Sequence, residues 1–242
     1  MRLLIFSFAI LATTALAQEN QPPPTPTWET LIAQGILPYR QLTVEDIPIK
    51  DDGDPKYAFN IQPMITPGYS FLLNRASNGF YYAYVQGWMV FCGLDKNKTS
   101  RKKSFKTMKA ELPFAQAFLD IAEIQSRRLG ALKPGELPSA RGKTSEEAVE
   151  ELKHKIEAFL DPVYKQYQTE AEAFAKATEN GSNKKKVREF AGEIKKRLEA
   201  TRATTVPFPE VKPSQGASVS PTATASATPG TPPASPTPAI EY

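Results

Sequence analysis

Residues 112–129, L-P-F-A-Q-A-F-L-D-I-A-E-I-Q-S-R-R-L, decide the fold of this chain of 242 residues. Apolar side chains recur there every three or four positions, which predicts an amphipathic helix with one buried face. We expect the helix to begin at Pro113, because proline in the first turn loses no intrahelical hydrogen bond. Most charged side chains lie off that face, and Glu123 and Arg127 are spaced for an i,i+4 ion pair.

Part of this stretch, F-A-Q-A-F-L-D-I-A-E, resembles the motif H-E-Q-x-H-F-D-I-x-E of a family of secreted bacterial proteins described as zinc-dependent proteases. In an H-E-x-x-H helix, two histidines one turn apart hold Zn²⁺ and the glutamate activates a metal-bound water. Phe114 and Phe118 stand at the histidine positions here, and Ala115 stands at the glutamate position. The surrounding pattern is retained at Gln116, Asp120 and Glu123.

A second segment, A-T-E-N-G at residues 177–181, resembles the family's E-T-x-H-G segment. The resemblance implies that this histidine is the third metal ligand, and Asn180 replaces it here. Thr178 and Gly181 are retained. Residues 42–47, L-T-V-E-D-I, resemble an L-T-W-x-D-F segment near the start of the family's domain, so the resemblance covers residues 39–198 in order.

The replaced positions have lost the chemistry that the family motif needs. A phenyl ring has no lone pair to give a metal, and alanine has no proton acceptor. A zinc site needs at least three protein ligands. We therefore interpret Phe114 and Phe118 as core residues and expect no metal and no cofactor. If the resemblance is correct, both rings and the region of Asn180 lie close together in the fold.

Residues 1–17 predict a secretory signal peptide. Arg2 supplies the positive charge, residues 3–12 the apolar run, and A-L-A at residues 15–17 the cleavage site. A membrane helix is the alternative, but the run is short for a bilayer span. We expect an exported protein, periplasmic or extracellular, without a lipid anchor at this position because no cysteine follows the cleavage site.

The cysteine, the histidine and the net charge each argue against a particular kind of bond or binding site. Cys92 is the one cysteine, so no intrachain disulfide is available, and its apolar neighbours favour a buried thiol over a disulfide between chains. The one histidine, His154, cannot build a zinc site alone, and we interpret it as a surface or helix-packing residue. A formal net charge of +4, spread over 30 basic and 26 acidic residues, is not typical of a nucleic-acid footprint.

Residues 57–93 are rich in strand-forming side chains. The strongest strand is F-Y-Y-A-Y-V-Q-G-W-M-V-F at residues 80–91, whose continuous apolar content predicts packing on both faces, with Gly87 as a bulge. Residues 58–62 and 69–73 alternate in the manner of strands. Residues 74–79 predict a hairpin loop that ends in Asn-Gly, a pair that tolerates positive φ.

Three features allow a functional interpretation beside a structural one. The aromatic strand at residues 80–91 could stack on sugar or single-stranded nucleic acid, but we favour core packing. The turn D-D-G-D-P at residues 51–55 lacks the full spacing and the closing glutamate of a calcium loop, so we favour a solvated turn. Clustered lysines at residues 95–109 could contact phosphates or anionic lipids, but we favour an exposed connector.

The remaining segments predict helices, a loop and a tail. Helices are expected at residues 28–34, 145–178 and 184–200. The long one begins with a Thr144–Glu147 capping box, and Pro162 should kink or divide it. Residues 130–142 carry two prolines and three glycines and predict a loop. From residue 204 onward, proline, threonine, serine and alanine dominate, which predicts a disordered tail.

The sequence therefore predicts an α+β fold, a small antiparallel sheet packed against about three main helices, followed by a disordered proline-rich C-terminal tail. The expected segments are a signal peptide (1–17), an N-terminal lead-in (18–38), a zincin-like domain lacking metal ligands (39–203) and the tail (204–242). We expect a non-catalytic relative of the family that serves as a binding or structural protein of the cell envelope or exterior.

Two other functions stay open at this point. The first is a hydrolase that uses Asp120, Glu123 and Glu111, since paired carboxylates perform acid–base work when they share a cleft and have displaced pKa values. The second is a binder of anionic surfaces through the basic residues of 96–109. The partner classes considered are thus an envelope protein or an anionic surface, and no nucleic acid is expected.

Overall fold

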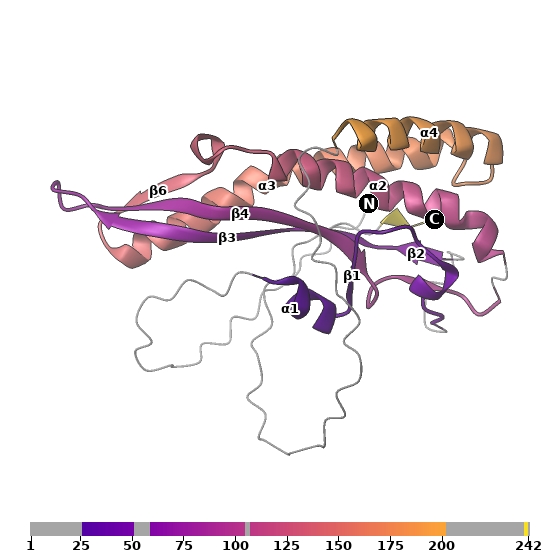
Figure 1. Ribbon diagram of the computed structural model, residues 1–242, viewed down its shortest axis with the longest axis horizontal. Helices are drawn as coiled ribbons and strands as arrows, with labels where there is room; N and C mark the ends of the chain where they lie inside the picture. The colour runs from indigo at the N-terminus through magenta and orange to yellow at the C-terminus, as the bar shows by residue number, and fades with distance from the viewer. Residues whose placement is uncertain (1–25, 51–58, 105–106, 202–239, 242) are drawn as a thin grey trace, which may run out of the picture.

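The computed structural model describes residues 26–50, 59–104, 107–201 and 240–241. An antiparallel sheet packs against three long helices (Figure 1), so the predicted α+β class is confirmed. Within these ranges no helix is both long enough and apolar enough to cross a membrane. The predicted signal peptide, the 51–55 turn and residues 204–239 of the tail lie outside the described residues.

A hairpin of two long strands, β3 (Pro63–Arg75) and β4 (Tyr81–Asp95), forms the centre of the sheet. β3 pairs with one edge of β4. The opposite edge of β4 pairs at one end with β1 (Ile36–Pro38) and at the other end with β6 (Ser139–Gly142). Figure 1 shows the hairpin tip reaching past β6, at the end of the molecule opposite to the start of α2.

Two glycines give the hairpin its turn and its bend. Gly79 has a φ of +84° in the connection between the strands, and Gly87 has a φ of +60° within β4. The pairing register shifts between Gly68 and Ser70, so two residues of β4 face one residue of β3. Glycine in the left-handed region is a usual first residue of such a β-bulge. The bulge at Gly87 is confirmed, and so is the hairpin connection, although β3 continues through Asn74 and Arg75, two residues into the predicted loop.

The aromatic strand is covered on both faces over only part of its length. Near its C-terminal end, Phe91 packs edge-on against Trp28 of α1 (Trp28–Ala33), with ring centroids 5.0 Å apart. Nearer the hairpin tip, Tyr84 is 42% exposed and its cross-strand partner Leu72 is 43% exposed. The prediction of packing on both faces is therefore wrong for the half that α1 does not cover.

The three main helices are α2 (Met108–Gly130), α3 (Ser145–Ala177) and α4 (Lys184–Ala200). The expected start of α2 at Pro113 is wrong: the helix begins five residues earlier, because its first residue, Met108, is buried and anchors the first turn in the core. Pro162 does not divide α3, which is assigned as one helix. α4 has the predicted bounds.

The long helix α3 begins with a variant of the predicted capping box. The Thr144 hydroxyl accepts a hydrogen bond from the backbone N–H of Glu147 at 3.2 Å, as expected. The Glu147 carboxylate, however, accepts from the N–H of Lys143, one residue before the cap, at 2.7 Å. In the standard capping box and in this variant alike, one hydrogen bond is accepted by the Thr144 hydroxyl and another by the Glu147 carboxylate, and together they fix the start of the helix.

Several short elements lie where the sequence predicts none. Residues 130–142 are not only a loop, because they contain the 3₁₀ turn η2 (Pro134–Glu136) and β6. A second small sheet has the order β5-β2-β7, formed by Ser100–Arg101, Phe59–Ile61 and Ile240–Glu241. Of these three strands, β2 lies within residues 58–62, where the sequence does predict a strand. The last strand lies within the predicted disordered tail, so that prediction is wrong for Ile240 and Glu241. These strands depend on pairing with distant segments, which local composition does not reveal.

α2 lies at the centre of the fold. It packs on β3 and β4 with one face and on α4 with another, and Figure 1 shows it between the sheet and α4. From Phe114 to Ser126 every residue is buried except Asp120, which is half-buried. The expectation that the charged residues lie off the buried face is thus wrong for Glu123, which is 6% exposed. A helix covered from two sides needs hydrogen-bond partners inside the protein for its buried polar side chains.

Candidate functional site: the motif positions on α2

Phe114 and Phe118 form the centre of a closed aromatic cluster. Each side chain is 1% exposed, and the two rings meet edge to face with centroids 5.0 Å apart. Phe174 of α3 stacks on Phe114 at 5.2 Å and meets Phe118 at a steep angle at 5.3 Å. Such pairs add to the roughly 1.5–3 kcal/mol gained by burying each ring. The positions that resemble the family's two histidines are therefore occupied by packed hydrocarbon.

The turn between α3 and α4 lies directly against this cluster. A Cβ atom added to Gly181 would lie 3.0 Å from Cγ of Phe114, so the backbone of Gly181 touches the ring. The predicted approach of Phe114 and the region of Asn180 is thus confirmed. Three consecutive residues of the turn have positive φ, namely Glu179, Asn180 and Gly181 at +54°, +53° and +83°. The segment reaches the cluster only through this left-handed turn.

Thr178 is the buried residue that caps the C-terminal end of α3. Its side chain is completely buried, and its hydroxyl donates to the backbone carbonyl of Phe174 at 2.8 Å. Asn180 is exposed, and its backbone N–H donates to the carbonyl of Ala175 at 2.7 Å. Ala115, at the position that resembles the catalytic glutamate, is also completely buried. Ala115 on α2 and Asn180 in the turn after α3 therefore differ in exposure, since the first is buried and the second is exposed.

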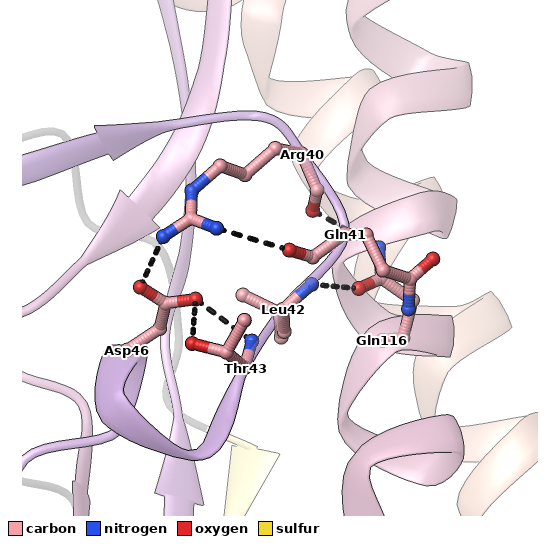
Figure 2. Close-up of polar contacts among 6 residues, drawn as sticks. All are labelled: Arg40, Gln41, Leu42, Thr43, Asp46 and Gln116. Carbon is pink, nitrogen blue, oxygen red and sulfur yellow. Dashed lines mark hydrogen bonds and ion pairs between the residues drawn. The ribbon is translucent and has the colours of Figure 1, made fainter.

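Gln116 joins α2 to the segment that precedes η1 (Val44–Asp46). Its Oε1 accepts from the backbone N–H of Leu42 at 2.7 Å, and its Nε2 donates to Oδ1 of Asp120 at 2.7 Å. Figure 2 shows the Gln116 amide between the backbone of residue 40 and that of Leu42. The amide thus satisfies a buried N–H that would otherwise lack a partner.

The segment held by Gln116 is itself closed by a carboxylate. Asp46 is 4% exposed and accepts from the Arg40 guanidinium at 2.5 Å and from the backbone N–H of Thr43 at 2.8 Å (Figure 2). These contacts give a physical role to the residues of the L-T-V-E-D-I segment. They close residues 40–46 into a tight loop. The hydrogen bond from the Leu42 N–H to Gln116 holds this loop against α2.

Asp120 completes the same network. Its Oδ1 also accepts from the Tyr39 hydroxyl at 2.9 Å. Burial raises the pKa of Asp120 above its usual value, although the bonds from Gln116 and Tyr39 oppose the shift. Burial and the neighbouring Asp120 likewise raise the pKa of Tyr39. The carboxylate is therefore held by two donors in a site that disfavours its charge.

Glu123 forms the neighbouring polar contact, one turn further along α2. It accepts from Nε of Arg127 at 2.7 Å, and Arg127 also donates to the backbone carbonyl of Leu198 in α4 at 2.7 Å. Burial raises the pKa of Glu123, with Arg127 opposing the shift. Burial and the nearby Glu123 raise the pKa of the Cys92 thiol. Cys92 is buried, as predicted, and a raised pKa does not suit a nucleophilic thiol.

The three carboxylates of the hydrolase hypothesis do not form one set. Asp120 and Glu123 are close enough for each to shift the pKa of Tyr39. Glu111 forms an ion pair with Lys184 of α4 instead, and nine residues of helix, about 13.5 Å along the axis, separate it from Asp120. Each of the two remaining carboxylates accepts hydrogen bonds from donors of the fold, Asp120 from Gln116 and Tyr39 and Glu123 from Arg127.

The other polar candidates are dispersed. His154 is exposed on α3, 3.8 Å from Glu157, in agreement with a surface residue. Across residues 26–50, 59–104, 107–201 and 240–241, no group of three or more His, Cys, Asp or Glu side chains could hold a metal ion. Of the basic residues at 95–109 that the structure describes, Lys98, Lys103 and Lys109 are exposed, and Lys98 lies 3.6 Å from Asp95.

Comparison with known proteins finds no matching family model, no matching curated protein and no matching solved structure.

Sequence reasoning missed the partners that complete the site. Phe174 belongs to the apolar stripe of α3, but nothing in the stripe indicates that this ring meets Phe114. Tyr39 had no signal beyond its chemistry as a donor, and the spacing of Arg127 predicted its pair with Glu123 but not its bond to Leu198. Their roles depend on contacts across 81 and 71 residues of chain, which local pattern cannot supply.

Proposed function

We propose that this protein is an exported, non-catalytic relative of the zincin-like family, retained as a binding or structural protein of the cell envelope or exterior. The observation that carries the proposal is the packing of Phe114 and Phe118 with Phe174 and Gly181. Aromatic rings fill the space where the family motif requires metal ligands, and the motif's glutamate is a buried alanine.

The residues retained from the motif support the same proposal, because each has a contact that the fold uses. Gln116 and Asp120 hold the segment around Leu42, Glu123 pairs with Arg127, and Thr178 caps α3. Gly181 is the residue that fits against Phe114. The pattern of retention thus follows structural need, while the positions that carry chemistry have changed.

A zinc titration by calorimetry on the chain that follows the signal peptide tests the proposal. We expect no stoichiometric binding at neutral pH, because phenyl rings donate no lone pair. Tight binding of one zinc ion per chain would overturn the proposal. Amino-terminal sequencing of the protein from an envelope fraction tests export, and a chain that starts at Gln18 is expected.

Restoring the motif gives a sharper experiment. The variant Phe114→His, Ala115→Glu, Phe118→His and Asn180→His places all four family residues on this backbone. We expect zinc to raise its melting temperature, since a ligand that binds only the folded state stabilises it. The same variant with Asn180 left unchanged is the control and should gain less. If the four-residue variant folds and zinc changes neither its melting temperature nor the calorimetric signal, the resemblance to a metal site is wrong.

A further inference from the structure

Two lysine-rich segments that are distant in the sequence meet at one end of the molecule. Residues 101–109 contain five basic residues and no acidic ones, and residues 184–188 contain four and none. Figure 1 shows that α2 and α4 begin at the same end. The ion pair between Lys184 and Glu111 joins the two helix starts directly. We call the exposed cations of this end, Lys103, Lys109, Lys185, Lys186 and Arg188, the basic pole.

The charge of the basic pole is poorly neutralised. Glu189 lies 4.0 Å from Lys185, with both side chains mostly exposed. In the part of the chain that the structure describes, no carboxylate pairs with the side chains of Lys109, Lys186 or Arg188. The nine cations of the two segments exceed the formal net charge of +4 for the whole chain, so the rest of the protein is net negative. Such asymmetry is typical of proteins that bind an anionic surface.

Apart from Lys184, which pairs with Glu111, the fold gives no reason for the lysines at the start of α4. The first turn of a helix favours acidic side chains, because its unpaired N–H groups carry partial positive charge. α4 has no acidic residue there and begins with three lysines. Lys185 and Lys186 are exposed and contribute nothing to the core. Positive charge at this position is unfavourable for the helix and favourable for an anion outside it.

We infer that the basic pole binds the surface of a membrane that contains anionic phospholipids. Four of its five residues are lysines, flexible point charges that suit a layer of head groups, whereas bidentate readout of nucleic acid uses arginine. Phe190 is 39% exposed one turn after Lys186 on the same side of α4. Basic side chains beside an exposed aromatic ring are typical of interfacial binding. The inference goes beyond the proposed function and does not depend on the loss of zinc.

Vesicle sedimentation with the full chain after the signal peptide tests the inference. The probe is vesicles of phosphatidylcholine alone or mixed equally with phosphatidylglycerol. We expect binding only to the anionic vesicles, decreasing with added salt because exposed charges are screened. The variant Lys109→Glu/Lys186→Glu should bind at least about 25-fold more weakly, from a factor of about five for each lysine lost.

The control variant, Lys143→Glu/Lys165→Glu, makes the same change in net charge at two exposed lysines away from the pole. It should retain binding within about fivefold. Equal losses in the two variants would overturn the inference, because net charge alone would then explain binding. Binding to duplex DNA without binding to anionic vesicles would also overturn it. Neither result bears on zinc, so the calorimetric test of the proposed function stays separate.

Discussion

At the turn between α3 and α4, Gly181 combines a φ of +83° with an aromatic ring in the space where a methyl group would lie. Both features disfavour a side chain, the first through the backbone conformation and the second because a Cβ would lie 3.0 Å from Cγ of Phe114. The absence of a side chain at position 181 lets the turn between α3 and α4 touch Phe114 of α2.

We therefore predict that Gly181→Ala lowers the free energy of unfolding by about 1–3 kcal/mol, from the left-handed backbone and the contact with Phe114. Urea unfolding of the purified variant measures the loss. Gly192→Ala is the matched control, because this exposed position in α4 has open space around it. It should gain roughly 0.5–1 kcal/mol from better helix propensity. A Gly181 variant as stable as the parent would show that the turn is not packed as described.

The buried carboxylates of α2 give a pH dependence with a definite sign. Burial raises the pKa of Asp120 above 3.8 and that of Glu123 above 4.5. The folded chain therefore binds these protons more tightly than the unfolded chain, and stability falls as pH rises through the window between the usual and the raised pKa values. Below the usual values this unfavourable contribution disappears.

Urea unfolding between about pH 4 and pH 7 measures this effect in the parent and in Asp120→Asn/Glu123→Gln. The parent should lose stability relative to the variant as pH rises, since amides do not ionise. A difference that stays constant with pH, or one that grows in favour of the parent, would contradict the assignment of the raised pKa values to these two residues.

At the scale of single elements, α2 shows what periodicity can and cannot predict. The apolar spacing of Phe114, Phe118 and Ile121 was sufficient for a helix with a buried face. It could not show that α4 packs on a second face or that Glu123 is buried, since the bond from Arg127 to α4 joins residues 71 positions apart. The first turn was missed because the burial of Met108 is a tertiary contact.

For the strands too, local composition predicts the long element, while pairing with distant residues decides the short ones. β4 was predictable because it carries a long aromatic and β-branched run. β1 and β6 have three and four residues, and pairing with β4 rather than composition makes them strands. For the candidate site, the sequence indicated that Phe114 and Asn180 belong to neighbouring segments, but it did not indicate Phe174 as the ring between α2 and α3.

Pro162 provides a test at the scale of α3. The helix continues through this exposed proline, which has no N–H to donate to the carbonyl four residues earlier. We predict that Pro162→Ala raises the free energy of unfolding by about 1–3 kcal/mol. Pro134→Ala is the control, because Pro134 opens η2, where proline is favoured, and its loss should cost no more than about 1 kcal/mol. A Pro162→Ala variant without added stability would argue that the helix has already adapted to proline.

At the scale of the whole molecule, the two ends differ in chemistry. The basic pole lies where α2 and α4 begin, and the hairpin tip lies at the opposite end (Figure 1). Leu72 and Tyr84, exposed near that tip, face solvent on the sheet surface that α1 leaves open. A chain bound through the basic pole would thus direct the hairpin away from the bilayer.

The one thiol of the chain, Cys92, lies on β4, is 3% exposed and faces Glu123 of α2. A thiol reagent that changes colour on reaction will reach the Cys92 sulfur only when β4 and α2 separate. We predict that the folded protein reacts on the order of a thousandfold more slowly than the urea-denatured chain. Rapid reaction without urea would show that the layers open locally. The protein thus contains an intrinsic reporter whose reaction rate measures the opening of its interior without any engineered label.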